Sequence, residues 1–249
     1  MMRTRWLLLW FEAPLQSWGA DSKFGRRDTM DFPTKSGVLG LLCAALGASG
    51  EQRELLAEMA PLRQTVISYV RSDKKNGENV KRERETTLMD FHMVGSGYDD
   101  SDPWQSLMIP KTAAGKKPNG PGTKMTYRYY LQDARFAVIL EVPEKRVDTF
   151  AEALLNPEFD IYLGRKNCVP TDFVFRDGNI FNTEEEAIAA IAKLLDEKKK
   201  LNQDFDLVED FRVVSGEAEG EILTLNDVPI QFGPVKQYRD RRVTIPPHE

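Results

Sequence analysis

The side chains best placed to do chemistry gather at the start of a short helix predicted after Thr34. Thr34 suits the N-cap position, and apolar residues at helical spacing follow it. Lys35, Ser36 and Gly37 then occupy the first turn, where backbone N–H groups lack helical partners and the helix dipole is positive. A phosphate arriving at this turn would meet free donors and an ammonium group. The pattern therefore predicts an anion site here.

The polar stretch before this helix would extend the anion site along a chain of phosphates. Lys23, Arg26 and Arg27 supply cations, and Trp18 supplies a ring that can stack on a nucleobase. Two alternatives stay open from the residues alone. The glycines of the helix would simply let it pack tightly against a sheet, and Trp18 would be a core residue.

Length and composition restrict the class of protein. The 249 residues suffice for one compact unit with elaborations. The longest strongly apolar run, residues 6–11, is too short to cross a bilayer, and no signal-peptide cleavage pattern follows the N-terminal arginines, so we expect a soluble cytoplasmic protein without a membrane partner. Two cysteines and two histidines make neither a disulfide framework nor a zinc cluster, and no metal or cofactor is expected.

The charges are segregated along the chain. The net charge is −5, but residues 61–128 hold 12 Lys and Arg against 8 Asp and Glu, whereas residues 140–232 hold 10 against 21. A nucleic-acid partner responds to the local field more than to the net charge. A basic track on an acidic protein is therefore possible, and the alternative is a solvated surface with chance clustering.

The spacing of apolar residues predicts an α+β chain. Strands are expected at residues 4–12, 64–71, 135–142 and 171–175, and helices after Thr34, at 51–59 and at 143–155. Residues 72–126 are irregular and rich in Gly, Lys, Asp, Pro and Asn, and long segments of this kind tend to be functional. The order strand, helix, strand, insertion, strand, helix, strand is the split βαβ pattern of a ferredoxin-like, or RNA-recognition-motif, sheet.

Two regions follow from this pattern. Residues 1–176 would form a body like an RNA-recognition motif, from which residues 72–126 project as an insertion. Residues 177–249 would add a helix at 183–201, which Thr183 and Glu186 begin as a capping box, and a small β-rich region.

Five motifs in order resemble the CasD family, the subunit of the type I CRISPR surveillance complex Cascade that holds the 5′ handle of the guide RNA. They are PLQSWG at residues 14–19, FPTKSGVLGLL at 32–42, DFH at 90–92, YLQDA at 130–134 and YLGRK at 162–166. The pattern is closest to the type I-E branch. The resemblance implies a non-catalytic RNA-binding subunit with a modified RNA-recognition fold, whose insertion at 72–126 is a thumb that wedges into the guide–target duplex.

The same resemblance implies a set of RNA contacts and partners. The handle would be bound by Gln16, Ser17, Trp18, Lys23, Arg26, Arg27, Lys35, Ser36, Gly37, His92, Arg128, Arg165 and Lys166. The partners would be the guide RNA, the backbone subunits CasC, the large subunit CasA and, through the assembled complex, target DNA.

Two other functions stay open. In the type I-C branch the equivalent subunit is a metal-independent endoribonuclease that uses Tyr, Lys and His to process repeat RNA. His92 is the only internal histidine here, but no lysine adjoins it in the sequence. An unrelated RNA-binding protein on the same fold is the third possibility, because a fold does not fix a function.

Overall fold

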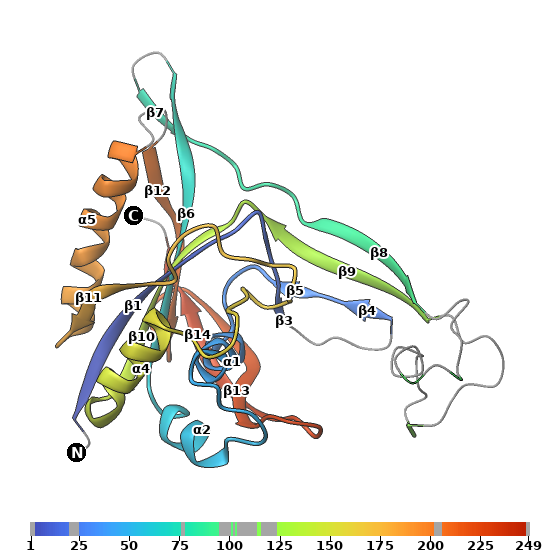
Figure 1. Cartoon of the computed structure of the whole chain (residues 1–249). Helices are drawn as coiled ribbons and strands as arrows, with labels where there is room; N and C mark the ends of the chain where they lie inside the picture. The colour runs from blue at the N-terminus through green and yellow to red at the C-terminus, as the bar shows by residue number, and fades with distance from the viewer. Residues whose placement is uncertain are drawn as a thin grey trace.

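The main sheet has the strand order β11-β1-β10-β6-β12-β14-β13, and β7 pairs with β6 at its side (Figure 1). The computed structural model describes residues 3–19, 25–75, 78–94, 101, 103, 114–115, 124–201 and 206–247. The strands of this sheet are β1 (Thr4–Glu12), β6 (Gln64–Lys75), β7 (Glu78–Lys81), β10 (Arg135–Pro143), β11 (Phe175–Phe181), β12 (Asp206–Ser215), β13 (Glu221–Gln231) and β14 (Gln237–Ile245).

Strand β1 lies inside the sheet and is covered on both faces. It pairs in antiparallel fashion with β10 on one side and β11 on the other. Leu7, Leu9 and Phe11 enter one hydrophobic core, whereas Trp6, Leu8 and Trp10 enter a second. Successive side chains of a strand point to opposite faces, so an uninterrupted apolar run fills both layers. The prediction of a central strand at residues 4–12 is confirmed.

Helices cover the two faces of the sheet unequally (Figure 1). Three helices pack on the first core: α1 (Lys35–Ala45), α2 (Arg53–Met59) and α4 (Val147–Leu155), the last entered through a 3₁₀ turn η1 (Glu144–Arg146). The opposite face carries α5 (Glu184–Leu201), whose buried residues Ala187, Ile191 and Leu194 meet Trp6, Leu8 and Trp10. None of the helices in the described ranges is long and apolar enough to span a membrane.

Helix α1 begins and ends as its sequence predicts. The hydroxyl of Thr34 accepts a hydrogen bond from the Gly37 N–H at 3.3 Å, as an N-cap does. Gly47 follows the helix with φ of 67°, the left-handed conformation that glycine adopts without steric cost.

The root of the predicted insertion is more regular than expected. Strand β6 continues to Lys75, and β8 (Leu88–Val94) pairs with β9 (Lys124–Gln132) to form a two-stranded arm that extends away from the body (Figure 1). Short alternating runs such as LMDFHMV carry a weak signal when the partner strand is distant in sequence. Residues 76–77, 95–100, 102, 104–113 and 116–123 of the predicted thumb lie outside the described residues.

The C-terminal strands extend the sheet of the body. β12 pairs with β6, and β14 joins β12 to β13. The division of the chain at residue 176 stays a prediction. The fourth strand of the body, β11, lies at Phe175–Phe181, later than the predicted 171–175, because the preceding residues pair with the end of β1 only through single contacts such as Thr171 N–H to the Glu12 carbonyl, 2.9 Å.

Four two-residue strands hold the loop before α1 against the arm. They are β2 (Leu15–Gln16), β3 (Trp18–Gly19), β4 (Arg26–Arg27) and β5 (Thr29–Met30). β2 pairs antiparallel and β4 parallel with β9, while β3 pairs with β5. The described parts of the stretch that the sequence analysis assigned to RNA binding, residues 15–19 and 25–30, therefore lie at the base of the arm.

Candidate nucleic-acid interface

The first turn of α1 already binds an anion, and that anion belongs to the protein. The Lys35 N–H donates to Asp227 Oδ2 at 2.7 Å, and the Gly37 N–H donates to the Thr34 hydroxyl. Asp227 in turn accepts two hydrogen bonds from the guanidinium of Arg241, at 2.7 and 2.9 Å. A carboxylate from β13 thus occupies the place that the sequence pattern assigned to a phosphate, which corrects that interpretation of the turn.

The side chain of Lys35 is equally committed to the fold. Its Nζ donates to the carbonyl oxygens of Ala60, at 2.9 Å, and Leu62, and the residue is only 2% exposed. Burial, with a smaller contribution from nearby Arg241, lowers the pKa of Lys35 to about 8. Lys35 therefore fastens α1 to the end of α2, and its ammonium group does not reach the surface.

The PLQSWG segment forms part of the core. Trp18 is fully buried and stacks on Phe11, with the ring centroids 5.3 Å apart. Gln16 is also buried; it donates to the Ala134 carbonyl at 2.6 Å and accepts from Trp18 Nε1 at 3.2 Å. A base has no free face of Trp18 on which to stack in this structure, so the alternative of a core tryptophan is the one observed.

The YLGRK segment packs against Ser17. Gly164 has φ of 102°, and a Cβ at this position would lie 1.8 Å from the Ser17 carbonyl oxygen, so the approach depends on glycine. The guanidinium of Arg165 donates to the carbonyls of Tyr129, at 2.9 Å, and Arg27, at 2.8 Å. These contacts bring Tyr162 beside α1.

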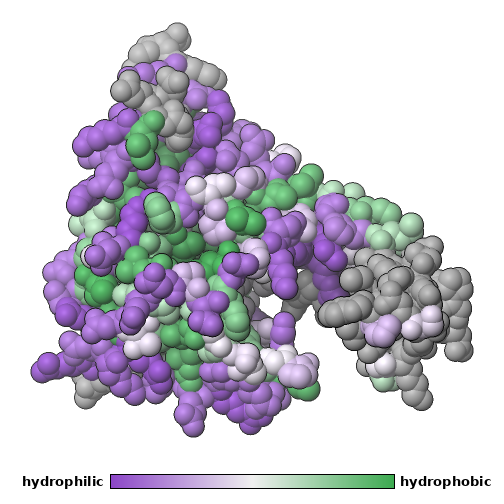
Figure 2. All heavy atoms as spheres, in the orientation of Figure 1, coloured by the Kyte–Doolittle hydropathy of each residue, from purple (hydrophilic) through white to green (hydrophobic). Residues whose placement is uncertain are grey.

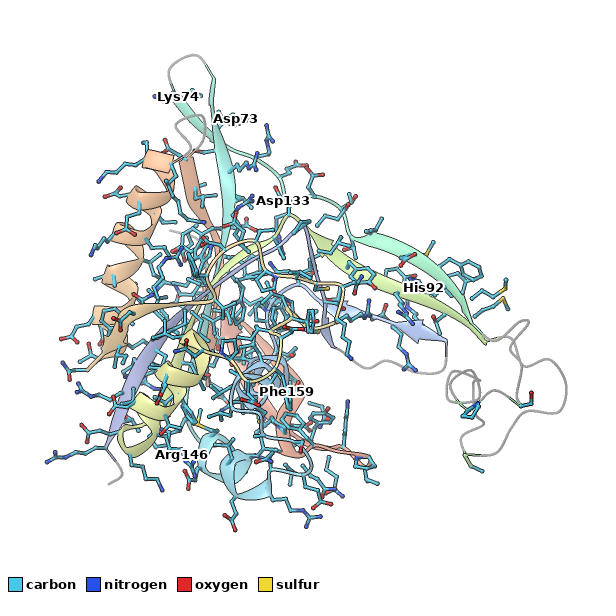
Figure 3. The ribbon with its side chains drawn as sticks, in the orientation of Figure 1. Asp73, Lys74, His92, Asp133, Arg146 and Phe159 are labelled. Carbon is cyan, nitrogen blue, oxygen red and sulfur yellow. The ribbon has the colours of Figure 1, made fainter. Side chains whose placement is uncertain are left out.

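A groove of about 660 Å³ runs over the partly exposed side of α1. Its floor is formed by α1 and includes four small residues of the helix: Ser36, Gly37, Gly40 and Ala44. The segments that border it include the loop after α4 and the hairpin formed by β13 and β14. They contribute four aromatic residues, Phe159, Tyr162, Phe232 and Tyr238, and Figure 3 shows Phe159 next to α1.

The charges of the groove are partly free. Arg27 and Lys236 line it, and within the described part of the chain neither side chain has a hydrogen bond or ion pair. The carboxylate of Asp28 is bonded to Arg26 at 2.8 Å, and that of Asp160 accepts from the Tyr162 hydroxyl at 3.2 Å. Free cations beside partly exposed rings are a combination that binds single-stranded nucleic acid.

A family model described as CRISPR-associated protein (Cas_Cas5) matches residues 6–244. The chain belongs to the Cas5 family. It is 33% identical over 173 residues to the CRISPR system Cascade subunit CasD of Escherichia coli (strain K12), an alignment that covers 68% of this chain and 69% of that protein. These matches confirm the resemblance found in the sequence.

Solved structures agree with this assignment to the Cas5 family. A chain of a CRISPR RNA-guided surveillance complex superposes with a TM-score of 0.64 at 27% identity, covering 96% of this chain and 88% of the other. A second, described as the crystal structure of Cas protein, gives a TM-score of 0.53 at 25% identity and covers 96% and 93%.

The structure of this Cas5 chain brings together only some of the predicted RNA contacts. Ser17, Arg27, Ser36, Gly37 and Arg165 line the groove. Lys166 is exposed on the neighbouring loop, and Arg26 lies outside, with its guanidinium 4.8 Å from the centroid of the Tyr129 ring. Lys23 lies outside the described residues.

Two further candidates sit on the arm. His92 on β8 bonds through Nε2 to Asp90, and Figure 3 shows it well along the arm. Arg128 on β9 is opposite Asp90 on one side and Arg27 on the other. The arm therefore joins the groove through Arg27 and Arg128, whereas His92 is separate from it. No group of three or more His, Cys, Asp or Glu suited to a metal ion occurs among the described residues.

Sequence reasoning missed the groove's aromatic residues and Lys236. Tyr162 lies inside the YLGRK motif, in which the neighbouring cations carry the stronger signal for RNA. Phe159, Lys236 and Tyr238 belong to no motif, and the last two come from the C-terminal part of the chain, which the sequence predicts as a small β-rich region. Only the fold brings residues 159–162 and 232–238 to the same helix.

Proposed function

We propose that this chain is the CasD-type subunit of a Cascade complex, of the type I-E branch, and that it binds the 5′ handle of the guide RNA in the groove over α1. The observation that carries the proposal is the groove itself: a floor of small residues, aromatic rings on its borders and free cations, in a member of the Cas5 family. Single-stranded RNA is held by this chemistry, because phosphates meet cations and splayed bases meet rings.

The strand order supports a modified RNA-recognition fold. β1, β6, β10 and β11 lie in the order β11-β1-β10-β6, with α1 and α2 between the first two strands and α4 between the last two. This is the arrangement expected of a split βαβ sheet. In the proposal, the handle lies across α1, on the face of the sheet that α1, α2 and α4 cover.

The arm supports a role as the thumb. Met89, Phe91 and Met93 on β8 and Met125 and Tyr127 on β9 are exposed, and Figure 2 shows hydrophobic residues along the arm. Phe91 and Tyr127 lie side by side, with ring centroids 5.3 Å apart. Such rings can wedge between base pairs of the guide–target duplex. The chain would contact the subunits CasC and CasA, and target DNA would bind through the assembled complex.

Co-purification tests the proposal directly. The tagged full-length chain is co-expressed with the proteins encoded beside it and with its CRISPR array, and the bound RNA is sequenced. We expect guide RNAs of uniform length with one fixed 5′ sequence. Recovery of neither RNA nor partner proteins would overturn the proposal.

The same material separates a structural subunit from a nuclease. The isolated chain is incubated with labelled repeat RNA in EDTA, and we expect no cleavage, since His92 is bonded to Asp90 on the arm, away from the groove. Cleavage that disappears in His92→Ala would instead identify a metal-independent endoribonuclease.

A further inference from the structure

The turn between β13 and β14 presents alternate side chains to two different grooves. Lys236 and Tyr238 face the groove over α1, whereas Gln237 and Arg239 line a second groove of about 560 Å³ between the hairpin and α2. Consecutive residues of a strand point to opposite sides, which explains the division. One short segment therefore contains matched residues inside and outside the candidate RNA site.

The hairpin turn is held firmly beside α1. The Phe232 N–H donates to the Glu51 carbonyl at 3.0 Å, and Gln231 Nε2 donates to the Val235 carbonyl at 2.8 Å. Further along the same two strands, the Asp227–Arg241 pair is bonded to the first turn of α1. These contacts fix the position of the groove's border, so a ligand would meet it preorganised.

Lys236 and Tyr238 complement the other border of the groove. On that border, Arg27 supplies a cation and Tyr162 supplies a phenol ring, from segments near the start and the middle of the chain. Lys236 is exposed and Tyr238 is half-buried, so an ammonium group and one edge of a ring remain open to a ligand. Each border thus offers one site for a phosphate and one for a base.

We propose that Lys236 and Tyr238 form a second RNA-binding border, in which Lys236 contacts a backbone phosphate and Tyr238 stacks on a base. The inference rests on the proposed function of the groove and extends it to the C-terminal hairpin. The handle then passes between two segments more than seventy residues apart in sequence, with α1 as the floor. Lys236 and Tyr238, which complete the site, belong to the acidic C-terminal part of the chain.

Two matched pairs of variants of the full-length chain test this assignment. Lys236→Ala is compared with Arg239→Ala, and Tyr238→Ala with Gln237→Ala, so each pair changes neighbouring positions that face different grooves. Each full-length variant is purified, and binding of a fluorescein-labelled single-stranded RNA carrying the repeat's 5′ tag is measured by anisotropy. Circular dichroism and urea unfolding check that the variants fold.

We expect Tyr238→Ala to weaken binding roughly 5-fold or more, as loss of one base stack does. Lys236→Ala should weaken it and reduce its salt dependence, while Arg239→Ala and Gln237→Ala should bind as the unmodified chain does. Ultraviolet cross-linking of the bound RNA should label the peptide that contains Tyr238.

Two negative outcomes are distinguishable. If Arg27→Ala weakens binding but both Lys236→Ala and Tyr238→Ala leave it unchanged, the groove binds RNA and the second border is overturned. If the unmodified chain itself does not bind the RNA, the proposed function fails together with this inference.

Discussion

Two glycines on the floor of the groove have different physical reasons to be glycine. A Cβ at Gly37 would lie 2.7 Å from Cε3 of Trp18, whose buried ring cannot move away. A Cβ at Gly40 would meet only Phe232 Cζ, at 4.0 Å, which is an ordinary contact. Tight packing therefore explains Gly37, whereas Gly40 keeps the floor open without helping the fold.

Alanine at these two positions should have opposite effects on stability. We expect Gly40→Ala to raise the free energy of unfolding by about 0.5–1 kcal/mol, because alanine is the better helix former. Gly37→Ala should lower it by roughly 1–3 kcal/mol through overpacking against Trp18. Urea unfolding of both variants measures the difference, and a stabilised Gly37→Ala would contradict the packing described for Trp18.

The buried amine of Lys35 predicts an unusual pH dependence. Burial lowers its pKa from 10.5 to about 8, so between these values the unfolded chain binds a proton that the folded chain has released. The contribution of Lys35 to stability therefore rises with pH from about 8 to about 10.5. Relative to Lys35→Met, the unmodified chain should gain roughly 1–3 kcal/mol between about pH 7.5 and pH 10. Urea unfolding at both pH values tests this, and a constant difference would exclude the shifted pKa.

At the scale of elements, the position of α1 depends on a strand pair far along the chain. Asp227 on β13 is bonded to the N-terminus of α1 and to Arg241 on β14, and both charged side chains are largely buried. Removing one charge of a buried pair leaves the other uncompensated. The C-terminal hairpin is thus part of the support of the groove as well as part of its border.

Neutralising Asp227 should be costly. We expect Asp227→Asn to lower the free energy of unfolding by roughly 3 kcal/mol, since the Arg241 guanidinium would stay buried without its partner. Asp240→Asn is the matched control, because Asp240 is exposed and, among the described residues, bonds only to the Asn226 amide. Its effect should stay within about 0.5 kcal/mol. Equal effects of the two substitutions in urea unfolding would show that the buried pair adds no stability.

We expect a substitution of Phe91 on the arm to affect binding of target DNA but not the stability of the chain. Phe91 is 49% exposed, so Phe91→Ser should change the free energy of unfolding by less than about 0.5 kcal/mol. In the assembled complex the same change should weaken binding of target DNA, because the exposed ring is the proposed wedge. Gel-shift titration of the complex measures this effect. Unchanged DNA affinity would remove Phe91 from the thumb's contacts.

At the scale of the whole molecule, RNA binding must work against a net charge of −5. Attraction therefore comes from local cations, and removal of one cation that neutralises a phosphate should reduce the slope of log affinity against log salt by about 0.7. We expect this reduction for Arg27→Ala and for Lys166→Ala, but not for Lys193→Ala on α5, which covers the opposite face of the sheet. Anisotropy titrations over a salt series give the slopes, and equal slopes for all three would remove the first two from the RNA site.

The sequence predicted the body of the fold better than the site. Apolar periodicity located β1, α1, α4 and β10 because burial on one or two faces leaves a local pattern. The sequence also correctly predicted N–H groups without helical partners at the start of α1. No local pattern, however, shows that Asp227, 192 residues away, binds one of them. The same holds for Trp18 and Lys35, which local chemistry assigned to RNA and which long-range packing turned inward.

The pairing of β1 has a consequence for synthesis of the chain. Trp6 lies opposite Glu141 on β10 and Phe181 on β11, so the most apolar strand acquires both neighbours only after residue 181 has been translated. At about 5–20 residues per second, the ribosome needs roughly ten to thirty seconds to make the intervening chain. During that interval an apolar strand with open edges is exposed, and we expect chaperones to hold the nascent N-terminus until β11 emerges.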